Sequence, residues 1–379
     1  MKYKTMLLGG IAAASLISAA VWAQGMSGPA MKGPATAPAR PAAGFQRDFA
    51  QWDKVTITVE QKIGSNLAIL HGNPGVDTSH PDASGGRVAV LYGPDGVMMV
   101  DDNNEEVGAK VLAAVRTLSN GPIKLLVNSH AHPDHTGGNA FFAKQGAVLM
   151  AQENLRDELM PNPNAPPRRA GAPALPPVDP ASLPVVTYNY NPATKGKPAV
   201  VIHMNGETVD VIPTMPAHMG GDSIIKFEKA NVIYIEDFYR NFGYPFADQG
   251  NGGSLAGMLD AIDMMGKLSD DNTLLIPGHG TLVHKKDLLP YRAMVADLLS
   301  KTKKMVASGK TLQDVEASDM LKPYAGQNQG EDAGSTKRFL DELYYEAKGL
   351  PPVVDGRRAM PRPSQAAAPA AAPAAAKKS

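Results

Sequence analysis

The chain has 379 residues, 43% of them hydrophobic and 20% charged, which is typical of a globular protein of one large or two ordinary domains. Lysine plus arginine equals aspartate plus glutamate, at 37 each, so the overall charge predicts neither a nucleic acid nor an anionic membrane surface as partner. Cysteine is absent, which excludes disulfides, thiolate metal ligands and lipid attachment to a cysteine.

The N-terminal residues predict an export signal. Positively charged residues 1–5 precede the apolar residues 6–21, and the small-residue pattern Val21-Trp22-Ala23 follows. This order is typical of a secretory signal peptide that is cleaved near Ala23. The alternative is a single membrane anchor, but the apolar stretch is short for a spanning helix and contains Gly and Ser. We therefore expect a signal peptide over residues 1–23 and a secreted or periplasmic protein without a stable membrane anchor.

The next part of the chain alternates strand and helix patterns. Short apolar or β-branched runs between Gly, Asn and Pro turns predict strands over residues 55–59, 67–70, 88–92, 97–100, 123–127, 200–203, 208–212, 224–227 and 232–235. Apolar residues at helical spacing predict helices over residues 105–118, 254–268 and 285–308. Hairpins mixed with crossover helices indicate an α/β (α+β) architecture, in which helices cover the sheets.

Three segments lack such patterns and are rich in Pro, Ala or Gly. Residues 24–54 predict a linker, and residues 351–379 predict a disordered Ala/Pro tail. Residues 161–184 form a Pro-rich insertion, for which a functional lid and a disordered excursion are both open. The main domain is accordingly expected over residues 55–350.

One loop concentrates potential metal ligands. His130, His132, Asp134 and His135 lie in Asn128-Ser-His-Ala-His-Pro-Asp-His-Thr-Gly-Gly-Asn139, directly after the apolar run 123–127. The whole chain has only nine histidines, so this crowding is poorly explained by core packing. Neutral imidazoles and a carboxylate are ligands that zinc prefers, although iron and manganese accept them too. The loop therefore predicts a metal site.

Other strand ends supply further candidates. His218 precedes Gly-Gly-Asp-Ser223, Asp237 follows the apolar run 232–235, and His279 lies in Pro-Gly-His-Gly280. Taken alone, each histidine is equally well read as a hydrogen-bonded loop residue, and the aspartate as a cap. Together with the first loop they repeat one theme, a ligand at the end of a strand, which predicts a shared metal centre.

These motifs, in this order, resemble the metallo-β-lactamase superfamily over roughly residues 55–308. The resemblance implies a four-layered αβ/βα sandwich of two mixed sheets flanked by helices, with the metals at one edge. It places His130, His132 and His218 around one zinc ion, and Asp134, His135 and His279 around a second. Asp237 would bridge the two, although related branches usually carry Gly where this chain has Glu236. Asp101 resembles the buried acidic residue that supports a ligand histidine from beneath the site.

The resemblance also implies a reaction. Two zinc ions would present hydroxide to a cyclic amide or ester, such as a β-lactam or lactone, with Asp134 orienting the nucleophile or passing on its proton. Thioester hydrolysis of the glyoxalase II type and a non-catalytic metal-binding relative are the alternatives. The expected partner is a small-molecule substrate and not a nucleic acid, and the oligomeric state is not predicted.

Overall fold

The computed structural model describes residues 52–74, 84–160, 178–327, 333–349, 353–354 and 357–358. The chain divides into the units 1–46 and 47–379, and all described residues belong to the second unit. The predicted signal peptide, most of the predicted linker, residues 161–177 of the insertion and most of the predicted tail lie outside the described residues.

Seven strands form the first sheet, in the order in which they follow one another in the chain. They are β1 Thr56–Ile63, β2 Leu67–Asn73, β3 Val88–Gly93, β4 Gly96–Val100, β5 Ile123–Val127, β6 Val148–Gln152 and β7 Val186–Tyr188. The first four pair antiparallel, and β4 to β7 pair parallel. Parallel pairing requires crossovers, which carry the helices α2 Gly108–Arg116, α3 Pro133–Thr136, α4 Asn139–Lys144 and α5 Glu153–Leu159.

The second sheet has five strands in the order β12-β11-β10-β9-β8. These are β8 Val200–Met204, β9 Glu207–Pro213, β10 Ser223–Phe227, β11 Val232–Glu236 and β12 Leu274–Pro277. The Asn205-Gly206 turn joins β8 to β9, and both residues have the positive φ that a tight hairpin turn requires. Within this sheet, the described pairs are antiparallel except for β11 and β12, which pair parallel; helix α6 Leu255–Leu268 lies between these two strands in the chain.

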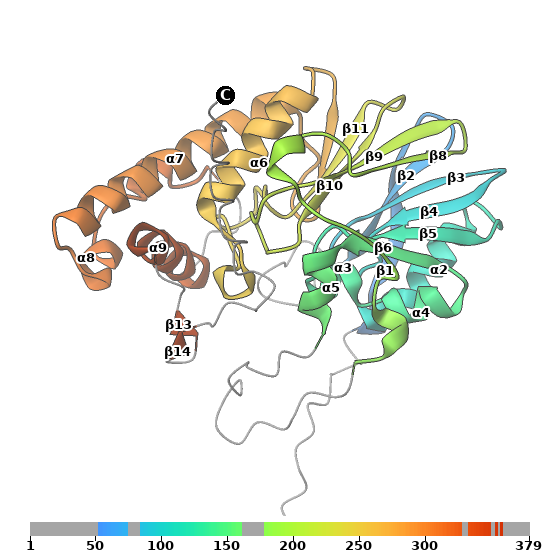
Figure 1. Ribbon diagram of the computed structural model, residues 1–379, viewed down its shortest axis with the longest axis horizontal. Helices are drawn as coiled ribbons and strands as arrows, with labels where there is room; N and C mark the ends of the chain where they lie inside the picture. The colour runs from blue at the N-terminus through green and yellow to red at the C-terminus, as the bar shows by residue number, and fades with distance from the viewer. Residues whose placement is uncertain are drawn as a thin grey trace, which may run out of the picture. The chain divides into compact units, whose positions relative to one another are not determined.

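The sheets and helices lie in layers (Figure 1), and the three largest apolar cores of the described residues hold them together. The central core joins the two sheets, and includes Ile69, Met98 and Val127 from the first and Val209, Ile225 and Ile276 from the second. A second core packs α2 and α4 on the outer face of the first sheet. A third core packs α6, α7 Lys285–Ala307, α8 Leu312–Glu316 and α9 Ala333–Lys348 with the second sheet. The structure confirms the predicted fold class, two mixed sheets flanked by helices.

The predicted strands and long helices are present, with ends shifted by a few residues. The sequence patterns did not predict β6, β7 or α9 as elements, and the short pair β13 Val353–Val354 and β14 Arg357–Arg358 falls inside the expected tail. Among the described residues, no helix is both long and apolar enough to span a membrane.

Candidate metal centre

The chain directions bring the predicted ligands to one edge of the sandwich. Strands β9 and β11 both pair antiparallel with β10, so they run the same way, and β12 runs parallel to β11. Their carboxyl ends therefore share an edge, where His218, Asp237 and His279 follow. The loop after β5 carries His130 to the same place from the other sheet.

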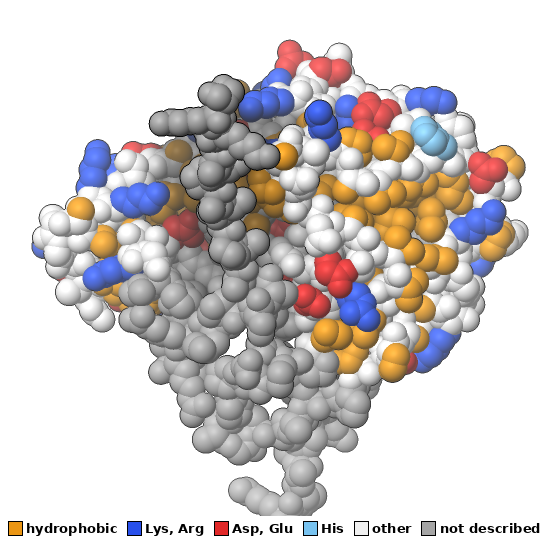
Figure 2. Space-filling model, in the orientation of Figure 1, with side chains coloured by type: hydrophobic (Ala, Val, Ile, Leu, Met, Phe, Trp, Pro, Cys, Tyr) orange, Lys and Arg blue, Asp and Glu red, His pale blue; other side chains and the backbone are white. Residues whose placement is uncertain are grey.

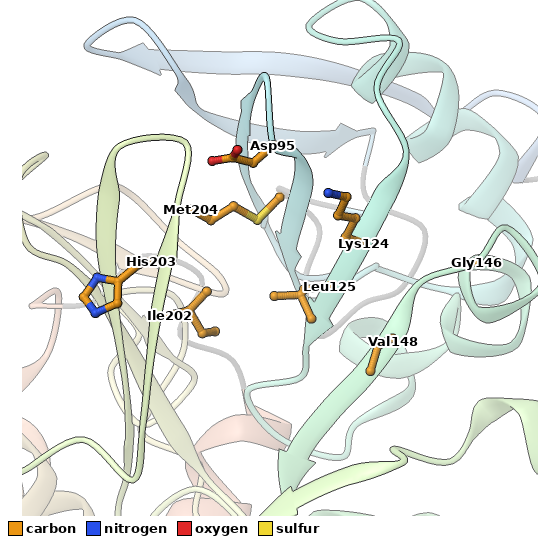
Figure 3. A pocket seen from close by; sticks show the side chains of 8 residues that line it. All are labelled: Asp95, Lys124, Leu125, Gly146, Val148, Ile202, His203 and Met204. Carbon is orange, nitrogen blue, oxygen red and sulfur yellow. The ribbon is translucent and has the colours of Figure 1, made fainter.

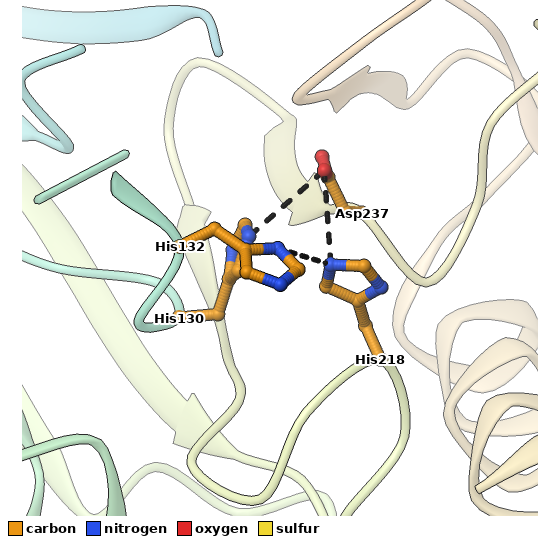
Figure 4. A group of neighbouring side chains, drawn as sticks. All are labelled: His130, His132, His218 and Asp237. Carbon is orange, nitrogen blue, oxygen red and sulfur yellow. Dashed lines mark hydrogen bonds and ion pairs between the residues drawn. The ribbon is translucent and has the colours of Figure 1, made fainter. Parts of the chain in front are cut away.

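The first ligand group consists of His130, His132, His218 and Asp237, whose ligand atoms lie within 4.8 Å of one another. Figure 4 shows their side chains converging from three separate loops. The Nε2 atom of His218 lies 3.0 Å from Nδ1 of His132. These are therefore the nitrogen atoms that the two rings present to a common point.

The second ligand group consists of Asp134, His135 and His279, again within 4.8 Å. The Oδ2 atom of Asp134 lies 2.9 Å from Nε2 of His279 and 3.8 Å from Nε2 of His135. Asp134 is 22% exposed, whereas both histidine side chains are fully buried. This carboxylate is consequently the member of the group that a molecule in solution can reach.

Asp237 faces both groups. Its Oδ2 atom lies 3.9 Å from Nε2 of His130, 3.8 Å from Nε2 of His218 and 3.4 Å from Nε2 of His279. Its Oδ1 atom lies 3.7 Å from Nε2 of His135. The position between the groups is the one that a bridging ligand requires.

Several buried atoms of the centre fit a metal ion. Within the described part of the chain, Nε2 of His130, Nε2 of His135 and Oδ1 of Asp237 have no hydrogen-bond partner. Such atoms are costly to bury unless something coordinates them. Gly278 permits the close approach, because a Cβ atom there would lie 2.0 Å from Oδ1 of Asp237. Buried imidazole and carboxylate donors without other partners suit a divalent metal.

Three of the candidate ligand histidines are oriented through the ring nitrogen that faces away from the centre. His135 Nδ1 lies 2.7 Å from Oδ2 of Asp101, and His218 Nδ1 lies 2.7 Å from the carbonyl oxygen of Phe246. His132 Nε2 lies 3.0 Å from Oδ2 of Asp248. Acceptors in these places hold the proton on the outer nitrogen and leave the inner nitrogen for a metal. Asp101 thus lies where the sequence predicts a supporting carboxylate.

The protein groups alone set unusual protonation at the centre. Burial, together with neighbouring histidines, lowers the pKa of His130, and the same causes lower the pKa of His218 to about 3. Burial also opposes charge on His135, but the carboxylates of Asp237, Asp134 and Asp101 outweigh it and raise its pKa to about 10. Burial works against the charge of Asp237 as well, but the surrounding histidines outweigh it and lower its pKa. Neutral His130 and His218 beside an ionised Asp237 match the protonation that a metal requires of its ligands.

Glu236 stands where the resembled branches usually carry glycine, and the structure shows what its side chain contacts. Its φ of 45° lies in the left-handed region, where glycine is favoured. The buried side chain turns back, so that Oε2 accepts a hydrogen bond of 2.6 Å from the backbone nitrogen of Asp237 and lies 3.3 Å from His130 Nδ1. Burial raises the pKa of Glu236, which favours its neutral form. Glutamate therefore adds a contact to the site that glycine does not offer.

The sequence analysis did not predict that Asp248 and Arg87 support the candidate centre. Asp248 lies in an irregular loop and contacts a histidine 116 positions away in the chain. Arg87 donates hydrogen bonds to the carbonyl oxygens of Pro277 and Gly280, on both sides of His279, and forms an ion pair with Glu60. No strand end or local motif marks either residue, so only the folded chain shows their role.

A separate hollow of about 520 Å³ lies at the start of β5 (Figure 3). Lys124 and Leu125, at the start of β5, line it together with Val148, Ile202 and Met204. Figure 2 shows hydrophobic side chains gathered in this region, which Figure 1 places between β8 and β5. His130 follows the opposite end of β5, so the hollow is not part of the candidate metal centre.

Part of the chain is similar in sequence to known proteins. A family model described as the metallo-beta-lactamase superfamily matches residues 82–187. A linear primary-alkylsulfatase from a Pseudomonas species is 37% identical over 78 residues, which are 19% of this chain and 15% of that protein. The chain therefore spans only a small part of the curated relative that it matches.

Solved structures of similar fold were also found. A metallo-beta-lactamase from Pontibacter korlensis has 15% identity and a TM-score of 0.49, with 63% of this chain and 99% of that chain covered. The metallo-beta-lactamase FIM-1 from Pseudomonas aeruginosa, in its mono-zinc form, has 16% identity and a TM-score of 0.47, with 64% and 95% covered. The metallo-beta-lactamase IND-7 has 18% identity and a TM-score of 0.47, with 62% and 98% covered.

Proposed function

We propose that this chain is an exported hydrolase of the metallo-β-lactamase superfamily with two zinc ions, and its motifs and the family-model match over residues 82–187 support this proposal. Its proposed substrates are cyclic amides or esters, with β-lactams and lactones as the first classes to test. The observation that carries the two-metal proposal is the position of Asp237, whose carboxylate lies within 3.9 Å of histidines from both ligand groups.

The assignment of ligands follows the two groups. His130, His132 and His218 would hold one ion, Asp134, His135 and His279 the other, and Asp237 would contact both. A pair of divalent cations supplies an activated water and polarises the bond to be broken. The supporting groups Asp101, Asp248 and the Phe246 carbonyl keep the ligand rings aimed at the ions, so little reorganisation is needed during the reaction.

Asp134 is the proposed catalytic residue. It is the carboxylate of the second group that solvent reaches, and its Oδ2 atom is directed toward His279. A carboxylate at this place can orient the attacking water, take up its proton and deliver that proton to the leaving nitrogen or oxygen. The proposal needs no nucleophilic side chain.

A second candidate is hydrolysis of a sulfate ester. The observation that favours it is the curated relative, which is named a linear primary-alkylsulfatase. Thioester hydrolysis and metal binding without catalysis are further outcomes that the experiment below distinguishes.

The test combines metal content with a substrate panel. The purified protein is expected to hold two zinc ions and to hydrolyse nitrocefin or a lactone, and treatment with a chelator should abolish this turnover. Turnover confined to a thioester or to a primary alkyl sulfate would replace the proposed substrate class. Metal binding without turnover of any panel member would favour the non-catalytic alternative. His203→Ala is a matched control, because this exposed histidine of β8 lies outside both ligand groups.

Export has its own measurement. Cell fractionation of the full-length chain should place a shortened protein outside the cytoplasm, with its new N-terminus near Gln24. Recovery of an unshortened chain in the membrane fraction would favour an anchor instead.

A further inference from the structure

Helix α9 lies beyond residues 55–308, which carry the resemblance, and beyond residues 82–187, which match the family model. We propose that α9 is a positioning element of the first ligand group, acting through a loop of residues 244–255 that orients His132 and His218. This inference rests on the proposed metal centre. It adds that one of the two metal sites depends on the C-terminal helix.

The loop of residues 244–255 contacts the first ligand group at two residues. The carbonyl oxygen of Phe246 accepts a hydrogen bond from His218. The Phe246 ring stacks on the His132 ring, with 5.8 Å between the ring centroids and an angle of 8° between the ring planes. Asp248 accepts a hydrogen bond from His132, and its backbone nitrogen donates to the carbonyl oxygen of His218 at 2.7 Å. A shift of this loop therefore moves both histidines.

Helix α9 holds the centre of the loop through Glu342. The Oε2 atom of Glu342 accepts a hydrogen bond of 3.1 Å from the backbone nitrogen of Ala247. Its carbonyl oxygen accepts one of 3.0 Å from the side chain of Gln249. These contacts fix the residues on either side of Asp248, and Glu342 is itself buried.

Arg338, one turn earlier on α9, holds the start of the loop. It donates a hydrogen bond of 3.3 Å to the carbonyl oxygen of Tyr244, and its guanidinium lies 4.5 Å from the centre of the Phe246 ring. A cation over an aromatic face is attractive and favours one ring position. Arg338 therefore acts on the aromatic ring that stacks on His132.

Glu346, one turn after Glu342 on α9, holds the end of the loop. Its carboxylate accepts hydrogen bonds from the Ser254 hydroxyl at 2.9 Å and from the backbone nitrogens of Leu255 and Ala256 at 3.0 and 2.8 Å. The first backbone N–H groups of a helix have no partner within the helix, and a carboxylate there is stabilising. Glu346 thus ties the start of α6, and with it the end of the loop, to α9.

The second ligand group is supported from other elements. Asp101, after β4, orients His135, and Arg87, before β3, holds the residues around His279. Loss of the contacts from α9 should therefore weaken one metal site selectively. General destabilisation would instead weaken both.

The experiment measures the two sites separately in the full chain. In a His279→Ala background, zinc affinity reports the first group, and in a His132→Ala background it reports the second. Adding Arg338→Ala or Glu346→Ala should weaken the first site by about tenfold and change the second by less than about twofold, judged from typical effects of residues that support ligands. Glu346→Gln should restore the first site only in part, because its single amide oxygen can accept from Ser254 and Ala256 but cannot also replace the second oxygen, which accepts from Leu255.

Lys337→Ala is the matched control. Lys337 is the neighbour of Arg338 on α9 but is 62% exposed and pairs with Glu316 and Asp341, so both affinities should remain unchanged. The cobalt absorption spectrum of the first site should change with Arg338→Ala and not with Lys337→Ala. Unchanged zinc affinity of the first site in both α9 variants, or equal weakening of both sites, would overturn the inference. Absence of zinc binding by the unmutated chain would refute the proposed function itself.

Discussion

Replacing Asp101 with Asn tests how strongly the centre depends on one buried carboxylate. Its Oδ2 atom accepts hydrogen bonds from His135 Nδ1 at 2.7 Å, from the Ser129 hydroxyl at 2.6 Å and from the Tyr234 hydroxyl at 2.9 Å. Its Oδ1 atom accepts one of 2.7 Å from the backbone nitrogen of Ser129. Asn is close in shape and tolerates the φ of 58° at this position, so the change removes charge and one acceptor without adding backbone strain.

The expected magnitude follows from the donors that face the new amide group. The hydroxyl groups of Ser129 and Tyr234 can rotate and accept a hydrogen bond from the amide NH2 group of Asn. The His135 ring can accept one only if its proton moves from Nδ1 to Nε2, the nitrogen that faces the metals. Ligand histidines that lose such a partner typically bind metal 10–100-fold more weakly, which is about 1.4–2.8 kcal/mol. The metal-free fold should lose about 3 kcal/mol or more, because a carboxylate with charged-group hydrogen bonds is replaced in a fully buried place.

The assay is zinc affinity by chelator competition, together with urea unfolding of the metal-free protein. Tyr234→Phe is the matched control, because it removes one donor to Asp101 and leaves the bond to His135. We expect a clear loss of zinc affinity for Asp101→Asn and a smaller one for Tyr234→Phe. Equal zinc affinity of Asp101→Asn and the unmutated chain would refute the reasoning that this carboxylate sets the proton position on His135.

The remaining predictions concern activity, protons and stability. His132→Ala should abolish turnover of whichever substrate the panel identifies, and retained steady-state turnover would rule out the assigned ligand set. Nearby carboxylates raise the pKa of His135 to about 10, so zinc uptake at pH 7 should release protons and zinc affinity should weaken as the pH falls. Titration calorimetry that gives the same heat in buffers of different ionisation enthalpy would contradict this proton release. Burial raises the pKa of Glu342 from 4.5 to about 8, so between pH 5 and 8 the folded state keeps a proton that the unfolded state has released. The free energy of unfolding should therefore fall as the pH rises through this range. Glu342→Gln should flatten that slope in urea unfolding, and an unchanged slope would exclude this carboxyl as its source.

Much of the fold could be predicted because apolar periodicity reports burial directly. Strands such as 97–100 and 232–235 are buried along their whole length and are bounded by turn residues, which makes them recognisable. Helix α9 was missed, since it is amphipathic but follows a polar stretch and no motif ties it to the domain. The pattern shows that a residue is buried, but it does not show which element buries it.

The candidate ligands could be named from the sequence for a different reason, namely that they follow strands, and the structure brings them together in two groups. Asp101 could be named too, because it ends the strand 97–100 and the family resemblance implies a buried acidic residue there; the structure then pairs this strand with the one that carries the histidine loop. Asp248 could not be named, because the loop that carries it has no periodic pattern and its partner is distant in the sequence. Glu236 was noted only as a departure from glycine, and its backbone conformation and contact with His130 needed the structure.

The most direct test of the two-metal account is anomalous diffraction at the zinc edge from crystals of the zinc-loaded chain. The account predicts two peaks about 3.5–4 Å apart, one among His130, His132 and His218 and one among Asp134, His135 and His279, with the Asp237 carboxylate between them. A single peak at full zinc loading, or two peaks that Asp237 does not contact together, would contradict it.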